Sequence, residues 1–461
     1  MVAFLNRIVD KPWFVVYLSC LGGLIFGYNT GIIVGGLGPI ADKFDLGTIM
    51  QGVVVCSILL GALLGSVSSG FIADKIGRKP VIFFTAIATI GGSIGSAVAT
   101  NVATICVLRL ILGLGVGCAS SVCPLMVAET TPQEKKGIYG AFFQISITVG
   151  IFLANIIALA LKKIGESNWR WMFALGAVPG VLMFFVWIII KESPIYLEKK
   201  NRINQSAEVQ KKSSFSILFS KQNRKPMFIG FLLATLSQLT GINAFMYFST
   251  TIFKDAGISG EYGPDIAAII LQFWNVATTL IALFAVNKVG RRVLLLTGSS
   301  VMTVCDLVIG LVFLVASGSA RGWVAIVFLF IFIAGFESSI GVLFWFVINE
   351  IMDEDAKNIG APIINALQWL FNLLLSFFFL SVVQYLGQYV MFFIFGGIGI
   401  FCTLFLKIYL PNLNAPSTTT VQEQIHNNNT VGSDEYFQHE KHSEKPLTTP
   451  ELKADQPTFP A

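Results

Sequence analysis

The chain has 461 residues, of which 54% are hydrophobic and 12% are charged, and its formal net charge is +5. Because soluble domains carry about 25% charged residues, this composition excludes an ordinary soluble protein and indicates one that crosses a membrane several times. The basic residues lie between apolar runs, which argues against a nucleic-acid-binding surface.

The cysteines and histidines exclude several kinds of chemistry. All seven cysteines lie inside apolar stretches and none forms a CxxC pair, so we expect small buried side chains rather than disulfides or a metal site. His426, His439 and His442 all follow the last apolar run, which excludes a histidine proton relay through the membrane. No nucleophile–base pair or phosphate-binding loop stands out. We therefore expect no enzyme activity, no cofactor and no metal.

Twelve runs are long and apolar enough to span a membrane, which takes about 20 mostly apolar residues in a helix. In chain order they cover residues 13–36, 48–72, 80–99, 103–127, 137–162, 169–190, 227–253, 264–287, 293–317, 322–349, 359–386 and 389–410. The sequence thus predicts an all-α membrane protein.

The longest interior polar segment divides the spans into six and six. We expect a cytosolic N-terminus (1–12), a first six-helix bundle (13–190), a cytosolic linker with short helices (191–226), a second bundle (227–410) and a disordered cytosolic tail (411–461). Basic loops follow even-numbered spans, so the positive-inside rule places both termini in the cytosol. No organelle address is visible, which leaves the plasma membrane as the expected location.

Two charged patterns recur in both halves. The loop "DKIGRK" follows the second span and "NKVGRR" follows the eighth. An acid and a lysine seven residues later bracket the junctions after spans four and ten: Glu129 with Lys136, and Glu350 with Lys357. Two matches in register indicate an internal repeat of the kind found in membrane transporters.

The repeated loop predicts a latch between helices that breaks and reforms during transport. Asp74 and Arg78 lie in a very short turn, where the arginine can pair with nearby acids or helix C-termini. The alternative is a loop that only sets topology, for which the acid is unnecessary. In the second copy Asn287 replaces the acid beside Arg291 and Arg292, so we expect a weaker latch there.

Several charges lie in or beside the apolar spans. Arg109, near the start of span four, should pair with an acid or face a cavity, unless it reaches the interface. Glu129 and Glu350 lie at cytosolic span ends, where the following lysines and the basic turns can pair with them. Glu337, near the middle of span ten, indicates a functional or gating charge.

The polar groups that could bind a ligand are mainly amides and indoles: Gln144, Gln238, Asn243, Asn275, Trp345, Gln368, Trp369 and Asn372. Each amide offers a donor and an acceptor to hydroxyl groups, and an indole face packs on the C–H surface of a sugar. Single amides could instead bridge helices, but the set favours a neutral polyhydroxylated solute.

The sequence resembles the sugar porter family of the major facilitator superfamily across nearly all of residues 13–410. The matching stretches, in order, are "GGLIFGYNTGII", "DKIGRKP", "RLILGLGVG", "PLMVAET", "NWRWM", "ESPIYL", "QLTGINAFMYFST" and "NKVGRR". The resemblance implies twelve helices in two six-helix bundles and a central sugar site that opens alternately to each side. It implies sugar contacts from Gln144, Gln238, Asn243, Asn275 and Trp345. Trp369 matches an aromatic close to the site, Tyr247 a residue that helps close it, and Glu337 an acid linked to the cytosolic gate.

The sequence departs from the family pattern at several positions. Ser237 replaces the first of two usual glutamines in span seven, which bears on substrate identity. The prolines usual in span ten are absent, so we expect less bending or a bend at Gly341. Gln368 replaces a frequent asparagine, Ile195 an arginine, and Pro411–Ala415 the usual PETKG, which predicts weaker latching at the C-terminal end.

Asn29 bears on how transport is powered. In proton-coupled members of the family an aspartate usually stands here and faces the arginine at the position of Arg109, and protonation of that acid frees the helix to move. Facilitators carry asparagine, which cannot exchange a proton. We therefore expect a uniporter. The alternative is coupling through another acid: Glu337, Glu129 or Asp306.

These observations predict facilitative transport of a hexose such as glucose by alternating access. Ser237 motivates an alternative, a carrier of a polyol or pentose, and proton-coupled symport is a second. A sugar sensor that does not transport is the third, although the polar tail is short for one. The expected partners are a small sugar and the lipid bilayer, without nucleic acid; the sequence carries no signal for an oligomeric state.

Overall fold

The computed structural model describes residues 12–132, 135–165, 167–205, 215–255, 257–258, 260–316, 318–352 and 354–411. These residues are almost entirely helical, and they include no strand. The helices of the first half are α2 (Pro12–Gly31), α3 (Ile33–Phe44), α4 (Thr48–Ile76), α5 (Arg78–Val98), α6 (Val102–Thr130), α7 (Lys136–Leu161), α8 (Asn168–Leu175) and α9 (Val178–Ile189). Apart from Pro12 and Pro411, the predicted N-terminal segment and tail lie outside the described residues.

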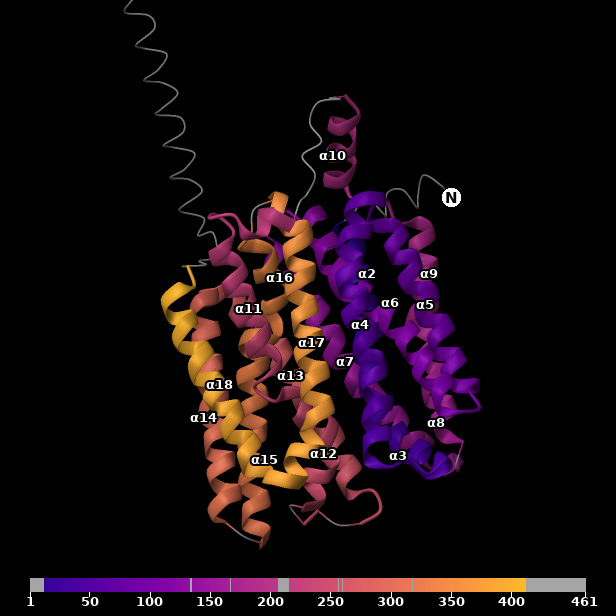
Figure 1. The fold of residues 1–461 in the computed structure, drawn as a ribbon, viewed down its shortest axis with the longest axis vertical. Coiled ribbons are helices and arrows are strands. Elements are labelled where there is room, and N and C mark those ends of the chain that lie inside the picture. Colours follow the sequence, from indigo (N-terminus) through magenta and orange to yellow (C-terminus); the bar gives the residue numbers. More distant parts are fainter. Residues whose placement is uncertain are drawn as a thin grey trace, which may run out of the picture. The chain divides into compact units, whose positions relative to one another are not determined.

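The linker contains α10 (Pro194–Gln205) and a 3₁₀ turn (Phe215–Phe219). The second half comprises α11 (Arg224–Gln238), α12 (Ile242–Asp255), α13 (Gly263–Lys288), α14 (Arg291–Val315), α15 (Gly318–Phe336), α16 (Val342–Glu350), α17 (Glu354–Leu386) and α18 (Gln388–Tyr409). We call the end where α10 and the loop after α4 lie the linker end, and the opposite end, near α3, the far end (Figure 1).

Eleven stretches of the described chain are long and apolar enough to cross a membrane. The predicted seventh span is built instead from two shorter helices, α11 and α12, which are separated by a turn at Leu239–Gly241. Gly241 has φ +90°, and a Cβ there would lie 2.5 Å from ring atoms of Phe395. A left-handed glycine packed against a ring therefore ends α11 and redirects the chain.

Two further spans are interrupted. The sixth span breaks between α8 and α9, where Pro179 follows the junction. The tenth span passes through a π-helical turn at Glu337–Gly341 between α15 and α16. A π turn often marks a functional position in a helix. The turn ends at Gly341, the residue at which the missing prolines led us to expect either a bend or less bending.

The helices of the first bundle approach closely through glycines. A Cβ at Gly61 of α4 would lie 2.1 Å from the Leu110 carbonyl oxygen, and one at Gly117 of α6 would lie 2.1 Å from the Ala62 oxygen. Side chains at these positions would push the helices apart. The glycines therefore allow backbone contact between apolar helices, as small residues do in membrane bundles.

The two bundles meet along α4 and α17 (Figure 1). Ser66 Oγ donates to the Pro362 carbonyl oxygen at 3.1 Å, and a Cβ at Gly70 would lie 2.7 Å from the Pro362 ring. These contacts lie between the middle of the helices and the linker end. They hold the bundles together on the linker side of the molecule's centre.

Candidate functional site

A cavity of about 750 Å³ lies between the bundles. Five of the residues predicted to contact sugar line it: Gln144, Gln238, Asn243, Asn275 and Trp345. Thr30, Ser237 and Glu337 line it as well. The cavity therefore combines amide, hydroxyl and indole groups with one carboxyl group, in walls that are otherwise largely apolar.

Amide side chains of the second bundle hydrogen-bond to each other in pairs that are close in sequence. Asn243 Nδ2 donates to Gln238 Oε1 across the turn between α11 and α12, and Asn275 Nδ2 donates to Gln272 Oε1 at 3.3 Å. The buried Asn275 Oδ1 accepts no hydrogen bond from the described residues. Because a buried acceptor without a partner is costly, this oxygen is suited to receive a ligand hydroxyl.

Gln144 links the bundles at the level of the cavity. Its Nε2 donates to the two carboxylate oxygens of Glu337 at 3.2 and 3.1 Å, and its Oε1 accepts from Trp345 Nε1 at 2.8 Å. Gln144 belongs to α7, whereas Glu337 begins the π turn and Trp345 belongs to α16. The nitrogen and the oxygen of the Gln144 amide are thus both hydrogen-bonded, to Glu337 and Trp345 respectively. A ligand that binds Gln144 must compete with these two residues.

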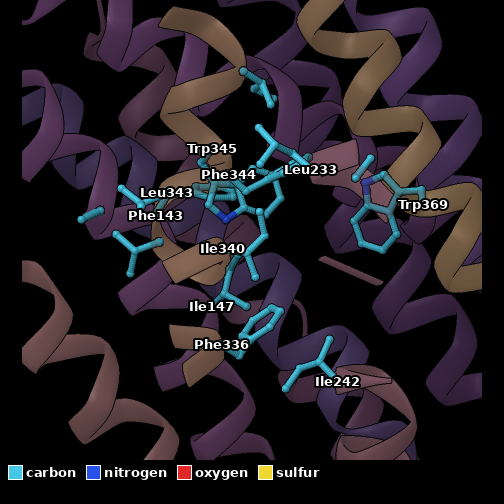
Figure 2. Packing of buried hydrophobic residues seen from close by; sticks show 14 of the residues in the cluster. Phe143, Ile147, Leu233, Ile242, Phe336, Ile340, Leu343, Phe344, Trp345 and Trp369 are labelled. Atoms are coloured by element: carbon cyan, nitrogen blue, oxygen red, sulfur yellow. The ribbon is translucent and has the colours of Figure 1, made fainter. Parts of the chain in front are cut away.

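The two predicted indoles lie in different environments. Trp345 packs edge-on against Phe143, with ring centroids 4.8 Å apart, in the cluster of Figure 2. Trp369 packs on Phe26 at 4.7 Å, and its Nε1 donates to Ser120 Oγ at 3.2 Å. Trp345 lines the cavity, whereas on α17 the cavity is lined by Gln368, the neighbour of Trp369.

The central cavity continues toward the far end. A second cavity of about 640 Å³ shares the lining residues Val34 and Asn155 with it. Lys162 and Asp265 line this far-end cavity and form an ion pair at 2.6 Å, with more than a third of each side chain exposed. The central cavity is therefore approached from the far end.

On the linker side the passage is closed. A third cavity, of about 270 Å³, lies there, and among described residues only Trp345 lines both it and the central cavity. Asn365 Nδ2 donates to the hydroxyls of Ser120 and Ser121, both at 2.9 Å, across the bundle interface. The bundles are thus sealed on the linker side of Trp345.

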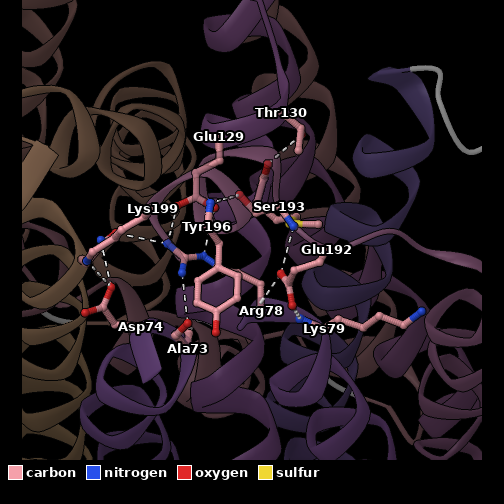
Figure 3. Close-up of polar contacts among 12 residues, drawn as sticks. Ala73, Asp74, Arg78, Lys79, Glu129, Thr130, Glu192, Ser193, Tyr196 and Lys199 are labelled. Carbon is pink, nitrogen blue, oxygen red and sulfur yellow. Dashed lines mark hydrogen bonds and ion pairs between the residues drawn. The ribbon is translucent and has the colours of Figure 1, made fainter. Parts of the chain in front are cut away.

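The predicted latch at Asp74 and Arg78 is built around a buried ion pair (Figure 3). Arg78 Nε and Nη2 donate to the carboxylate of Glu129 at 2.9 and 2.5 Å, with 1% and 3% of the side chains exposed. The guanidinium lies 5.2 Å from the ring centroid of Tyr196. Two parallel bonds of this kind are strong and geometrically specific. Burial raises the pKa of Tyr196 further above neutrality, and its hydroxyl donates to the Lys75 carbonyl oxygen at 3.2 Å.

The linker and the second bundle complete the latch. Glu192 accepts the backbone N–H groups of Arg78 and Lys79 at 2.9 and 3.0 Å, at the positive N-terminus of α5. Asp74 pairs with Lys199 at 2.8 Å. Asn358 of α17 donates to Asp74 and accepts from Arg78, at 3.2 and 3.3 Å. The loop after α4 therefore holds both α10 and the opposite bundle.

Glu192 belongs to a motif that the sequence resemblance had already singled out, although its bonding to the loop backbone was not predicted. Asn358 and Lys199 were missed, because polar residues at a helix end or in a linker carry no distinctive spacing. Only the fold brings these residues to the loop.

The second copy of the motif forms an ion pair too. Arg291 pairs with Glu350, and Arg292 donates to the Lys407 carbonyl oxygen at 2.7 Å. Lys357 is buried near the start of α17. The side chains of three other predicted residues, Lys136, Tyr247 and Asn287, lie outside the described residues.

Asn29 and Arg109 are both buried inside the first bundle, next to the junction of α8 and α9. Asn29 Nδ2 donates to the Ile25 and Gly176 carbonyl oxygens at 3.0 and 3.4 Å, and its Oδ1 accepts from Ser93 at 3.3 Å. Arg109 donates to the Val54 carbonyl oxygen at 3.2 Å and lies over the ring of Phe173 at 5.2 Å. Both residues thus hold the short segment from Phe173 to Gly176.

Comparison with known proteins identifies the family. The model of the family described as sugar (and other) transporter matches residues 15–217 and 204–424. The arabinose-proton symporter of Bacillus subtilis is 31% identical over 442 residues, covering 89% of this chain and 95% of that protein. The glucose transporter GlcP of Staphylococcus epidermidis is 30% identical over 437 residues, covering 90% and 97%.

The predicted fold is confirmed by a solved structure. The proton:xylose symporter XylE bound to 6-bromo-6-deoxy-D-glucose superposes with a TM-score of 0.77 at 24% identity, covering 88% of this chain and 97% of that chain. The all-α arrangement is thus the two-bundle fold of the major facilitator superfamily. The chain belongs to the sugar porter family of that superfamily, and is a multi-pass membrane protein of sugar transport rather than an enzyme.

Proposed function

We propose that this protein is a uniporter that carries a hexose such as glucose down its gradient by alternating access. The arrangement of the central cavity supports the substrate class. Amides that donate and accept, an indole face and an unpartnered acceptor on Asn275 suit a ring with several hydroxyl groups. The similarity to a glucose transporter agrees with a hexose.

The bonding of Asn29 is the observation that carries uniport. Its amide nitrogen faces the Gly176 carbonyl oxygen, and its oxygen accepts from Ser93. An amide satisfies both neighbours in one fixed state, whereas an ionised carboxylate would set an oxygen against a carbonyl oxygen. The amide cannot take up or release a proton at physiological pH. No protonation step is therefore needed at this position.

Proton-coupled symport is the second candidate function, and two observations favour it. Several relatives are named proton symporters, among them the arabinose-proton symporter of Bacillus subtilis and the galactose-proton symporter of Escherichia coli. In addition, the Asp306 carboxyl is fully buried, and neither of its oxygens has a hydrogen-bond partner among the described residues. Glu337 is equally buried beside the cavity, whereas Glu129 is held in the latch by Arg78. Asp306 and Glu337 are thus the acids through which coupling would run.

Ser237 keeps a pentose or polyol as the alternative substrate. It lines the cavity, but its hydroxyl donates to the Ala234 carbonyl oxygen of its own helix at 2.9 Å. A glutamine would extend further into the cavity. The loss of that contact favours substrates that need fewer hydrogen bonds.

We place the linker end in the cytosol and the protein in the plasma membrane. The support is the clustering of basic side chains in the linker-end loops. A single cysteine replacing Lys79 should react with an impermeant thiol reagent only when the cytosolic face is exposed. Labelling from outside intact cells would reverse the orientation.

Counterflow of labelled glucose into proteoliposomes preloaded with unlabelled sugar tests transport and substrate together. We expect a transient overshoot that excess hexose abolishes and pentoses or polyols reduce less. Overshoot with xylose or a polyol alone would identify the alternative substrate. Glucose binding without counterflow would identify a sensor instead.

A further inference from the structure

The cavity on the linker side of Trp345 is lined by polar groups from both bundles. Ser120 and Ser121 come from α6, Asn349 from α16 and Asn365 from α17. It is much smaller than the central cavity, and in this closed state it leaves room for little more than one water molecule. It lies on the side to which the passage must open for a sugar to leave toward the linker end.

The amide oxygens of this cavity have no protein partner. Asn349 and Asn365 are 8% and 1% exposed, and the Oδ1 atom of each accepts no hydrogen bond from the described residues. Their nitrogens are occupied: Asn349 Nδ2 donates to the Trp345 carbonyl oxygen at 2.9 Å, and Asn365 Nδ2 donates to the serines. Buried acceptors are normally satisfied, so two in one cavity point to a ligand that donates hydroxyl groups.

Trp345 joins this cavity to the central one. Trp345 lines both cavities, and its Nε1 donates to Gln144 Oε1 on the central side. An indole offers an apolar face to the C–H surface of a sugar. A solute that leaves the central cavity toward the linker end therefore passes Trp345 and meets the two asparagine oxygens next.

We propose that Asn349 and Asn365, with Ser120 and Ser121, form a second sugar-binding subsite on the linker side of Trp345. This inference rests on the proposed sugar transport. The subsite is closed here because Asn365 binds the serines across the interface. Separation of α6 from α17 widens it and removes the hydrogen bonds that the serine hydroxyls accept from α17, so that it holds sugar only in the state open to the linker end.

A comparison of the KM for efflux with the KM for influx distinguishes a sugar-binding role of Asn349 from a purely structural one. Asn349→Ala removes one acceptor and leaves the bundle-bridging bonds of Asn365 in place. Loss of one hydrogen bond to the sugar, roughly 1 kcal/mol, should raise the efflux KM about three- to tenfold. A uniporter must keep Vmax/KM equal in the two directions, so the ratio of efflux Vmax to influx Vmax should rise by the same factor as the ratio of efflux KM to influx KM. A folding defect would instead lower Vmax in both directions.

Asn155→Ala is the matched control. Asn155 Nδ2 also donates at 2.9 Å to the carbonyl oxygen four residues earlier in its helix, but the residue lines the central and far-end cavities. The Asn155→Ala variant should not raise the ratio of efflux KM to influx KM. Asn349→Ser, which keeps a shorter hydroxyl, should give an intermediate ratio and serves if the alanine variant does not fold.

The test is zero-trans influx and efflux of labelled glucose in sealed vesicles of known orientation, without a proton gradient. A raised KM ratio for Asn349→Ala but not Asn155→Ala supports the subsite. An unchanged ratio with intact wild-type transport overturns the subsite alone and means that the asparagine oxygens bind only water. Absence of wild-type glucose transport overturns the proposed function, and the sugar subsite with it.

Discussion

The side-chain amide of Gln144 donates to both carboxylate oxygens of Glu337, from opposite bundles, at the centre of the molecule. The carboxyl group, 1% exposed, is held by this neutral donor from the other bundle and by Thr279 of its own bundle. Sugar binding and bundle movement both have to exchange these hydrogen bonds.

Removing the Gln144 amide should lower the stability of the protein more than replacing the Glu337 carboxyl with an amide. Gln144→Leu removes the amide nitrogen that donates to both oxygens of the buried Glu337 carboxyl, leaving its hydrogen bond with Thr279, and should lower stability by about 2–3 kcal/mol. Glu337→Gln keeps one amide–amide hydrogen bond with Gln144 and should cost less than about 1 kcal/mol. Thermal unfolding of both variants in the same detergent measures the difference. Equal losses would mean that the carboxylate is not dependent on this amide.

The latch predicts a contrast between a buried and an exposed ion pair. Glu129→Gln breaks the buried pair with Arg78 and should lower stability by about 3 kcal/mol or more. Asp265→Asn breaks the half-exposed pair with Lys162 at the far end and should cost about 1 kcal/mol or less.

Of these two variants, only Glu129→Gln should also make the linker-side cavity accessible from the linker end. A cysteine replacing Ser121 should react faster with a linker-side thiol reagent when combined with Glu129→Gln than with Asp265→Asn. Unchanged reactivity in both backgrounds would show that the Arg78–Glu129 pair does not hold the linker end closed.

Alanine at Gly241, in the turn of the seventh span, should clash with a neighbouring ring. Comparison with Gly257 separates the cost of this clash from the cost of backbone strain. Gly241 and Gly257 both have φ +90°, but a Cβ at Gly241 would lie 2.5 Å from the Phe395 ring, whereas nothing lies within 4 Å at Gly257. Both alanine variants carry the cost of a left-handed residue, about 1 kcal/mol. Gly241→Ala should lose a further 1–3 kcal/mol from overpacking. Matching melting temperatures would contradict the close packing at this turn.

Asn29→Asp should introduce pH dependence that the native protein lacks. The protonated acid can donate to the Gly176 carbonyl oxygen as the amide does, whereas the ionised acid cannot. Uptake by the variant should therefore rise as the pH falls, while native uptake stays constant from mildly acidic to mildly alkaline conditions. Asn29→Ser, a polar residue without a titratable group, is the control and should show no pH dependence. A flat profile for the aspartate variant would contradict the assigned bonding of Asn29.

The spans were predictable because a bilayer demands long apolar helices, and hydropathy records length and composition directly. The break in the seventh span was not, because Leu239–Gly241 leaves the apolar run intact. What ends α11 is a backbone conformation fitted to Phe395, which lies more than 150 residues away in the chain.

The site was predictable by residue type more than by position. Gln368 and Trp369 are adjacent in sequence, but successive helical residues point about 100° apart, and only the first lines the cavity. The Arg78–Glu129 pair joins residues of one bundle that the motif had placed at the same end. The links through Asn358 and the closed cavity beyond Trp345 depend on how the two bundles meet, which no local pattern records.

The most direct test of uniport is the steady-state level of labelled glucose in proteoliposomes under an imposed inward proton gradient. The bonding of Asn29 predicts equal internal and external concentrations, with or without the gradient. Accumulation above the external concentration that a proton ionophore abolishes would contradict uniport and direct attention to Glu337 and Asp306.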